Sequence, residues 1–207
     1  LSKFVKKIGI ITNGFLLNSQ TIKYLMNFPQ IEIKISTEGI NEEIYEFYRG
    51  KGNFEKFINI LEKMKENNFD KTLMWTITET NSYQIDEFFD FCKKYNFSKF
   101  IVERFIPWGN GSKIKNEVIK LNTWINVINE LFEKCDIEFN IDLIHLYRGF
   151  MVERGEKGNF LYGACCVVGK DGLAIMPNAD VFPCRRFPLK IGNLLQQKLS
   201  DIWENSP

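Results

Sequence analysis

The chain has 207 residues, 44% of them hydrophobic, and its 27 Lys and Arg residues almost balance its 26 Asp and Glu residues. This length can bury a substantial core, as one large domain or as one domain with a small appendage. The balanced charge argues against partners bound mainly through a basic surface, so we expect no nucleic-acid partner and no membrane partner. The chain has 5 cysteines and shows no basic-apolar leader, which predicts reduced thiols or metal ligands in a cytoplasmic protein.

Apolar, β-rich runs alternate with segments of helical period along most of the chain. The run at residues 6–12 predicts a buried strand. Further runs of the same kind predict strands at residues 31–36, 72–78, 99–105 and 137–143. Helices are expected between the strands, near residues 18–27 and from Asn53 onward, with Asn53 as the N-cap. Two later helices carry Cys92 and Cys135 on their apolar stripes, so we expect both thiols to pack as small hydrophobes.

A strand followed by a helix, repeated along the chain, predicts a parallel sheet with helices packed outside it. Five such units are too few for a closed eight-stranded barrel, so we expect an α/β fold with a partial (β/α) barrel or an open sheet. From about residue 160 the sequence changes to Gly-rich turns, a short strand pair and a helix. We therefore predict two domains, residues 1–158 and residues 159–207, the second a β-hairpin followed by a helix.

Polar side chains follow the expected parallel strands, where ligands bind in such sheets. Asn13 follows the first strand, Ser36 and Glu38 the second, Asn81 the third, and Arg104 ends the fourth. Such residues are common in ordinary strand–helix turns. Their occurrence at every one of these ends, with a carboxylate and a guanidinium among them, indicates a site for a small polar ligand that carries both charge signs, such as an amino acid or a nucleoside.

Several motifs resemble those of radical S-adenosylmethionine (SAM) enzymes. The stretches IGIITNG, IKISTEG and YRGKGNFEKF are similar to the family patterns TNG, S-hydrophobic-D/E-G and RG-x-G-x-F. The stretches TITETNSYQIDEFFDF and VERFIPWGNG resemble the next two strand-to-loop passages of that family. The resemblance implies that residues 1–158 form a partial radical SAM (β/α) barrel.

The same resemblance implies roles for individual residues. Ser36 and Arg49 resemble residues that hold the methionine carboxylate of SAM, and a hydroxyl and a cation suit that carboxylate physically. Asn81 and Arg104 would line the ribose and adenine side. The cofactor-binding residues that we expect are Asn13, Ser36, Glu38, Arg49, Asn81 and Arg104.

The stretch GACCVVGKDGLAIMPNADVFPCRRF, residues 163–187, resembles the start of the SPASM or twitch extension of these enzymes. In that extension a Cys-x2-Gly is followed by a strand, a tight turn, a second strand and Pro-Cys. The resemblance implies that residues 159–207 begin an auxiliary [4Fe-4S] domain with Cys166 and Cys184 as ligands, and Cys165 as an adjacent alternative. The glycine usual in the hairpin turn is Ala179 here, so we expect Asn178 to take the positive φ.

The residues alone leave other uses of these cysteines open. A disulfide between Cys165 and Cys166 would be strained, and a reducing compartment disfavours one from either to Cys184. Three cysteines and the distant His145 are a poor set for zinc, and a [4Fe-4S] cluster also needs about four thiolates. This chain therefore holds at most part of a cluster site, and zinc, another metal or plain thiols remain alternatives.

Three departures from the family limit what the resemblance implies. The printed sequence contains neither the CxxxCxxC that holds the catalytic cluster nor the GGEP motif, and it lacks the SPASM cysteines downstream of the tryptophan helix. We expect the chain to be a piece of a longer enzyme, cut at both ends and inactive alone.

The resemblance implies that the intact enzyme is an oxidoreductase that generates a 5′-deoxyadenosyl radical for hydrogen abstraction. It would use SAM, [4Fe-4S] clusters and an electron donor such as ferredoxin or flavodoxin. The substrate would be a peptide or a small molecule, and peptide modification by a maturase is our first hypothesis. The alternatives are a radical SAM enzyme of tetrapyrrole or other cofactor biosynthesis, and a non-catalytic binding fragment.

Overall fold

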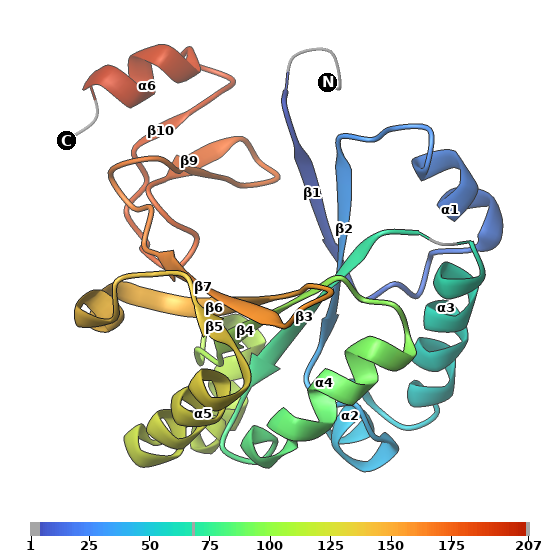
Figure 1. Ribbon diagram of the computed structural model, residues 1–207. Coiled ribbons are helices and arrows are strands. Elements are labelled where there is room, and N and C mark those ends of the chain that lie inside the picture. Colours follow the sequence, from blue (N-terminus) through green and yellow to red (C-terminus); the bar gives the residue numbers. More distant parts are fainter. Residues whose placement is uncertain (1–4, 68, 206–207) are drawn as a thin grey trace. The chain divides into compact units, whose positions relative to one another are not determined.

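The computed structural model describes residues 5–67 and 69–205, which form two compact units divided between Ala164 and Cys165 (Figure 1). The sequence places the domain boundary earlier, between residues 158 and 159. The difference arises because strand β7 (Asn159–Cys165) pairs with β5 (Asp136–Ile137) in the sheet of the first unit. No helix in the described part of the chain is long and apolar enough to cross a membrane.

Within the described residues the first unit has a seven-stranded sheet of order β1-β2-β3-β4-β6-β7-β5. Its parallel strands are β1 (Ile8–Thr12), β2 (Ile31–Thr37), β3 (Lys71–Ile77) and β4 (Lys99–Arg104). The helices of the unit are α1 (Ser19–Leu25), α2 (Glu42–Arg49), α3 (Phe54–Glu66), α4 (Ile85–Lys94) and α5 (Leu121–Lys134). Short 3₁₀ segments are η1 (Ser82–Gln84), η2 (Gly109–Glu117) and η3 (Ile141–Leu146). The predicted α/β fold with a partial barrel of parallel strands is confirmed.

The prediction of a strand at residues 137–143 is wrong. Only Asp136–Ile137 forms a strand there, and the strand that follows β4 in the sheet order is β6 (Tyr147–Arg154), which runs antiparallel to it. The ring of Phe139 instead packs as part of a loop, 4.9 Å from the ring of Tyr147 and 5.7 Å from that of Phe150 between centroids. An apolar run can therefore lie in a loop and pack against a strand, without forming a strand itself.

The helix-facing side of the sheet is the dry side. On β3 the alternate side chains Leu73, Trp75 and Ile77 are fully buried. Trp75 stacks on Phe88 of α4 with 3.8 Å between ring centroids. The expected packing of Cys92 and Cys135 is confirmed, since both are buried free thiols. Burial raises the pKa of the Cys92 thiol strongly and that of Cys135 to about 11, so both stay protonated at neutral pH.

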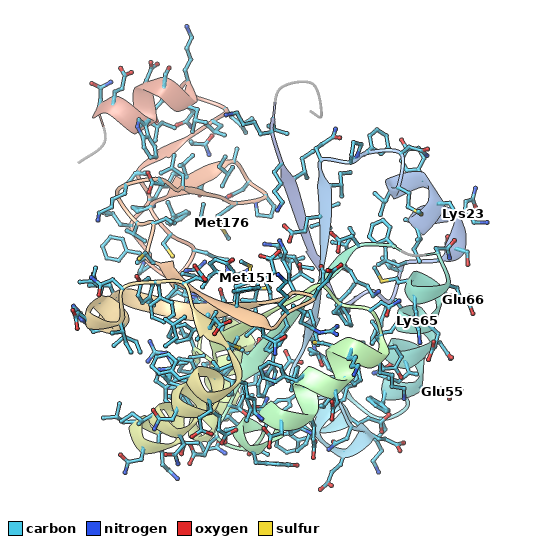
Figure 2. The ribbon with its side chains drawn as sticks, viewed as in Figure 1. Lys23, Glu55, Lys65, Glu66, Met151 and Met176 are labelled. Carbon is cyan, nitrogen blue, oxygen red and sulfur yellow. The ribbon has the colours of Figure 1, made fainter. Side chains whose placement is uncertain are left out.

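The charged side chains of α3 lie on its other side, away from the sheet. Glu55, Lys65 and Glu66 are exposed there, as Figure 2 shows. Asn53 precedes the helix as expected, but its side chain makes no N-cap hydrogen bond. The free N–H of Phe54 is taken instead by the carboxylate of Glu46, at 3.3 Å. A carboxylate from a neighbouring helix thus replaces the predicted local cap.

The opposite side of the sheet is polar and only half-buried. Glu32 pairs there with Lys7 at 3.0 Å, and Glu103 pairs with Arg148 at 2.9 Å. This side carries the intervening residues of each strand, because successive side chains alternate between the two faces. A sheet with one dry face and one polar face can keep its shape while presenting polar groups to a ligand.

Strand β1 differs from the prediction of a buried strand. It lies at the end of the sheet order, and Ile11 is 60% exposed. Among the described residues only β2 pairs with it, so one of its edges and much of its apolar surface stay uncovered. Its sequence is that of an interior strand, whereas its position in this chain is that of an edge strand.

The second unit has a small antiparallel sheet of order β10-β9-β8. Its elements are β8 (Ala174–Ile175), β9 (Asp180–Phe182), β10 (Gly192–Asn193) and α6 (Leu199–Asn205). These confirm the predicted hairpin and helix. Among residues 165–205 the buried apolar side chains are Val181 and Ile202.

The hairpin turn between β8 and β9 corrects one expectation. Ala179, and not Asn178, takes the positive φ, at +66°. The side chain of Asn178 is used elsewhere in the turn, since its amide donates to Asp180 Oδ2 at 2.8 Å and its Oδ1 accepts from the Asp180 N–H at 3.3 Å. Because Asn178 closes this turn with its side chain, the strained backbone conformation falls on the next residue.

Candidate functional site

Three of the expected cofactor residues meet at the carboxyl end of β2. The Arg49 guanidinium of α2 pairs with both carboxylate oxygens of Glu38, with 2.8 Å between Nη2 and Oε1. The same Nη2 donates to Ser36 Oγ at 3.2 Å, and Ser36 Oγ donates to the carbonyl of Thr12 at 3.3 Å. Residues from β1, β2 and α2 thus form one polar cluster at the edge where parallel sheets bind ligands.

The charge of Arg49 is well supported in this cluster. Burial by itself lowers the pKa of the Arg49 guanidinium, but the hydrogen bonds and charge of Glu38 outweigh it, so the pKa is raised. The side chains of Arg49 and Glu38 keep 25% and 17% exposure, so the pair is held firmly yet remains accessible. The cluster therefore presents a fixed cation beside a hydroxyl, a donor set that suits a carboxylate.

Gly39 allows α2 to begin close to this strand end. A Cβ at residue 39 would lie 2.5 Å from Cγ2 of Ile44 and 2.9 Å from the backbone nitrogen of Tyr45. Both distances are shorter than real Cβ contacts, and one of them is to backbone, so a larger residue would push α2 away. The glycine of the STEG stretch therefore serves the approach of Arg49 to Glu38.

Asn81 joins the cluster through the backbone. It is fully buried, and its Nδ2 donates to the carbonyls of Glu38 and Thr76, the latter at 3.0 Å. Its Oδ1 accepts the N–H of Thr78 at 2.8 Å. Asn81 therefore holds the strand ends together. Its expected contact with the ribose or adenine stays a prediction, which the burial of Asn81 does not support.

Arg104 lies apart from the cluster. Its register partner on β3 is Ile77, a buried residue on the helix side of the sheet. The Arg104 guanidinium lies over the ring of Trp124 on α5, 5.3 Å from the ring centroid. The odd–even position of a residue in a strand decides the face to which it points, and Arg104 has the helix-facing position. A cofactor contact by Arg104 stays a prediction that this placement does not support.

Asn13 stays beside the cluster with its oxygen used locally. Its Oδ1 accepts the N–H of Phe15 at 3.1 Å, which closes an Asx turn directly after β1. Thr12, its neighbour, is the residue whose carbonyl Ser36 contacts. Asn13 therefore lies at the same carboxyl edge of the sheet as the cluster.

Sequence reasoning missed a second polar group at this edge. The hydroxyl of Tyr48 donates to Glu117 Oε2 at 2.6 Å and lies 2.7 Å from Thr78 Oγ1. Glu117 is 5% exposed and Thr78 is fully buried. A glutamate within a lysine-rich loop carries no sequence signal of burial, and only its contacts reveal it.

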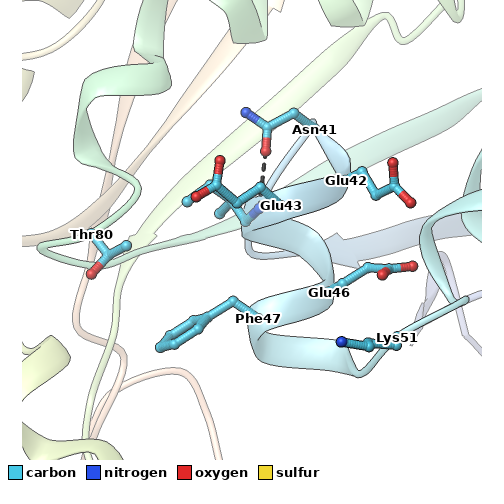
Figure 3. Close-up of a pocket in the computed structure, with 8 residues that line it drawn as sticks. Asn41, Glu42, Glu43, Glu46, Phe47, Lys51 and Thr80 are labelled. Atoms are coloured by element: carbon cyan, nitrogen blue, oxygen red, sulfur yellow. Dashed lines mark hydrogen bonds between the residues drawn. The ribbon is translucent and has the colours of Figure 1, made fainter.

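A hollow of about 800 Å³ is lined by residues of α2 and its ends and by Thr80 (Figure 3). Figure 3 shows Glu42 and Glu46 on one side of the helix and Phe47 on the other, the side on which Thr80 lies. Asn41 Oδ1 accepts the Ile44 N–H at 3.0 Å and caps the helix there. Glu42 and Glu43 lie in the first helical turn, where carboxylates favour the helix dipole, and Glu46 accepts the Phe54 N–H, so helix stability accounts for this acidic rim.

The cysteines of the second unit flank the hairpin in the sequence, with Cys165 and Cys166 before β8 and Cys184 after β9. Cys165 and Cys166 are exposed, and Cys184 is half-buried. Cys184 Sγ accepts the backbone N–H of Arg186 at 3.4 Å, and Gly169 takes a φ of +71° in the turn that follows Cys166. Among the described residues, no group of three or more His, Cys, Asp or Glu side chains is placed to hold a metal ion. The residues present fit a partial contribution of thiolates to a cluster and do not complete a site of about four ligands.

Comparison with known families agrees with this architecture. Residues 2–92 match the radical SAM superfamily, and residues 165–207 match the SPASM iron–sulfur cluster-binding domain. The chain is 22% identical over 214 residues to an AdoMet-dependent heme synthase of Methanosarcina barkeri, covering 97% of this chain and 61% of that protein. It is 23% identical over 209 residues to the antilisterial bacteriocin subtilosin biosynthesis protein AlbA of Bacillus subtilis, covering 99% of this chain and 44% of that protein.

A solved structure shows the same fold. Streptococcus suis SuiB bound to its precursor peptide SuiA superposes with a TM-score of 0.65 at 18% identity, over 97% of this chain and 48% of that one. Residues 2–92 thus belong to the radical SAM superfamily by their match, and residues 165–207 to the SPASM domain, while the solved structure shows the shared fold. It spans about half the length of the curated relatives that it matches.

Proposed function

We propose that the intact protein is a radical SAM peptide maturase in which this chain supplies part of the SAM site and part of an auxiliary [4Fe-4S] site. The observation that carries the proposal is the cluster of Ser36, Glu38 and Arg49 at the carboxyl edge of the sheet. Family membership supports the SAM and iron–sulfur chemistry. With both cofactors bound, the reduced catalytic cluster would cleave SAM to give the 5′-deoxyadenosyl radical that abstracts hydrogen.

This chain's own residues would bind and orient the cofactor. The guanidinium of Arg49 would hold the methionine carboxylate by charge-assisted hydrogen bonds, and the hydroxyl of Ser36 would join it by turning its proton from the Thr12 carbonyl to the ligand. Glu38 would keep the guanidinium in place before the ligand arrives, which lowers the cost of ordering it on binding. Asn81 would act from behind by fixing the backbone of Glu38.

The auxiliary site would use Cys166 and Cys184, with Cys165 as the alternative to Cys166. The amide N–H directed at Cys184 Sγ is consistent with this role, since hydrogen bonds to the sulfurs set the potential of such clusters. The ligands of the catalytic cluster are not among the motifs of the printed sequence. We propose a reducing, cytoplasmic location, because the five cysteines are free thiols. An electron donor such as ferredoxin or flavodoxin is proposed from the match to the radical SAM superfamily.

Peptide substrates are favoured over small molecules because of the relatives. SuiB is described bound to a precursor peptide, and AlbA is described as a bacteriocin biosynthesis protein. The heme synthase supports the second candidate, cofactor biosynthesis, at similar identity. The two hypotheses predict different substrates. Incubation with reduced enzyme and SAM should change the mass of a peptide under the first hypothesis and that of a cofactor precursor under the second.

The first test is SAM cleavage by the full-length protein after anaerobic reconstitution. We expect visible iron–sulfur absorbance and formation of 5′-deoxyadenosine on reduction, measured by chromatography. Arg49→Lys should raise the KM for SAM about tenfold or more, since one ammonium cannot replace the bidentate fork. Arg154→Lys is the matched control, because Arg154 binds the carbonyl of Phe97 at 2.9 Å, away from the cluster. Equal effects of the two changes, or no 5′-deoxyadenosine at all, would contradict the proposal.

The second test concerns the auxiliary cluster. The Cys166→Ala/Cys184→Ala variant should lose about four iron atoms per chain and part of the visible absorbance. Cys92→Ala is the control, since that thiol is buried in the first unit and should leave the iron content unchanged. Unchanged iron in the double variant would show that the ligand assignment is wrong.

A further inference from the structure

We propose that Tyr48 and Glu117 are positioning residues for the SAM carboxylate site and act through Arg49. The proposal rests on the SAM site proposed above and extends it to residues that do not touch the cofactor. Tyr48 directly precedes Arg49 in the last turn of α2. Fixing the Tyr48 side chain therefore fixes the part of the backbone from which the Arg49 guanidinium extends.

The contacts of Tyr48 form a directed chain of hydrogen bonds. Its hydroxyl donates its only proton to Glu117 Oε2, so it must accept from the Thr78 hydroxyl, 2.7 Å away. Thr78 Oγ1 in turn accepts the backbone N–H of Asn81 at 3.2 Å. Burial and the hydrogen bond to Glu117 raise the pKa of Tyr48, so the phenol stays protonated and keeps donating at neutral pH.

Glu117 is anchored independently of Tyr48. Its Oε1 accepts from Asn116 Nδ2 at 3.2 Å, and its backbone carbonyl accepts the N–H of Glu79 at 3.1 Å. Glu79 is tied to α5 through the Lys120 N–H at 2.9 Å and the Thr123 hydroxyl at 3.1 Å. The buried carboxylate is therefore a fixed point to which Tyr48 attaches α2.

The loop after β3 thereby holds both partners of the ion pair. Asn81 Nδ2 binds the carbonyl of Glu38, and Thr78 binds the hydroxyl of Tyr48. One partner is fixed through β2 and the other through α2, so the loop sets the separation between Glu38 and Arg49. We call Tyr48, Thr78, Asn81 and Glu117 the polar clamp.

The experiment compares two ligands of the full-length, reconstituted protein. SAM carries the methionine carboxylate, whereas 5′-methylthioadenosine has the same nucleoside and no amino-acid group. Tyr48→Phe should raise the dissociation constant of SAM about three- to tenfold, the value of one buried hydrogen bond, and leave that of 5′-methylthioadenosine within about twofold. Glu117→Gln still accepts the Tyr48 proton and should rescue most of the SAM affinity, while Glu117→Leu should behave as Tyr48→Phe.

Tyr83→Phe is the matched control, since this exposed tyrosine lies in the same loop region and should change neither affinity. If Tyr48→Phe lowers the thermal midpoint strongly, Thr78→Val gives the same comparison with a nearly isosteric change. A parallel loss of both ligands would reduce the clamp to a purely structural role and overturn the proposal, as would unchanged SAM affinity.

Arg49→Lys separates this inference from the proposed function. If Arg49→Lys weakens SAM alone and Tyr48→Phe does not, only the clamp is wrong. If Arg49→Lys leaves SAM affinity unchanged, the SAM site itself is wrong, and the clamp has nothing to position.

Discussion

The two compact units of this chain keep their shapes by different means. The first unit buries a continuous apolar layer between its sheet and its helices, in which Trp75 and Phe88 stack. The second unit buries only Val181 and Ile202 among its described apolar residues. It relies on polar turns, such as the contact of Asn193 Nδ2 with Asp180 Oδ1 at 2.8 Å.

The difference teaches where each unit obtains its stability. A large apolar core stabilises the first unit, whose polar strand ends carry a preformed Glu38–Arg49 pair. A unit with so small a core lies near the lower limit for independent folding, where bound metals commonly add stability. The proposed cluster would therefore serve the second unit structurally as well as chemically.

The sharpest way to test the comparison is to remove a large side chain from each unit. Trp75→Ala should cost about 3–5 kcal/mol of unfolding free energy, because it empties a fully buried stack. Trp203→Ala, at a tryptophan of the second unit that is 51% exposed, should cost about 0.5 kcal/mol or less. Chemical denaturation measures both, and equal costs would break the comparison.

A second change concerns a buried charge in the first unit. Lys71 is 1% exposed, and burial lowers the pKa of its ammonium from 10.5 to about 8. The unfolded chain then binds the proton more tightly, so stability falls as pH drops from about 10.5 through about 8, by about 2–3 kcal/mol. Lys71→Met should remove this slope and raise stability at pH 7. Unfolding measured between pH 7 and 10 would refute the burial argument if the variant kept the slope of the parent protein.

The polar turns of the second unit should matter more than its size suggests. Asn193→Ala removes contacts to Asn178, Asp180 and Leu195 and should cost about 1–3 kcal/mol, because one buried side chain loses all these hydrogen bonds together. Hydrogen exchange of residues 165–205 should accelerate while that of the first unit stays unchanged. Asn205→Ala, in an exposed residue at the end of α6, is the control and should leave the exchange of both units as it was.

The smallest expected effect is a gain. Ala179→Gly should stabilise the second unit by about 1 kcal/mol, because glycine adopts the positive φ without a Cβ clash. Asn178→Gly should give no such gain, since Asn178 does not hold the positive φ and its side chain closes the turn. The reverse ranking in thermal unfolding would restore the sequence-based assignment of this turn.

Prediction from the sequence succeeded where local patterns decide structure. The four parallel strands, the helices between them and the C-terminal hairpin follow from apolar periodicity and from turn residues. It failed at residues 137–143, where apolar side chains cover β6 from a loop, and at Asn53, whose cap is a carboxylate from α2. Contacts between distant parts of the chain decide these cases, and a local pattern does not contain them.

The same limit divides the candidate site. The sequence by itself determined which polar residues stand at the strand ends, and their motifs led to the radical SAM superfamily. Only the tertiary structure decided that Ser36, Glu38 and Arg49 meet, that Arg104 turns to Trp124, and that Glu117 is buried. The physical reason is that strand parity and loop packing fix the direction and the neighbours of a side chain, and both depend on segments far away in the chain.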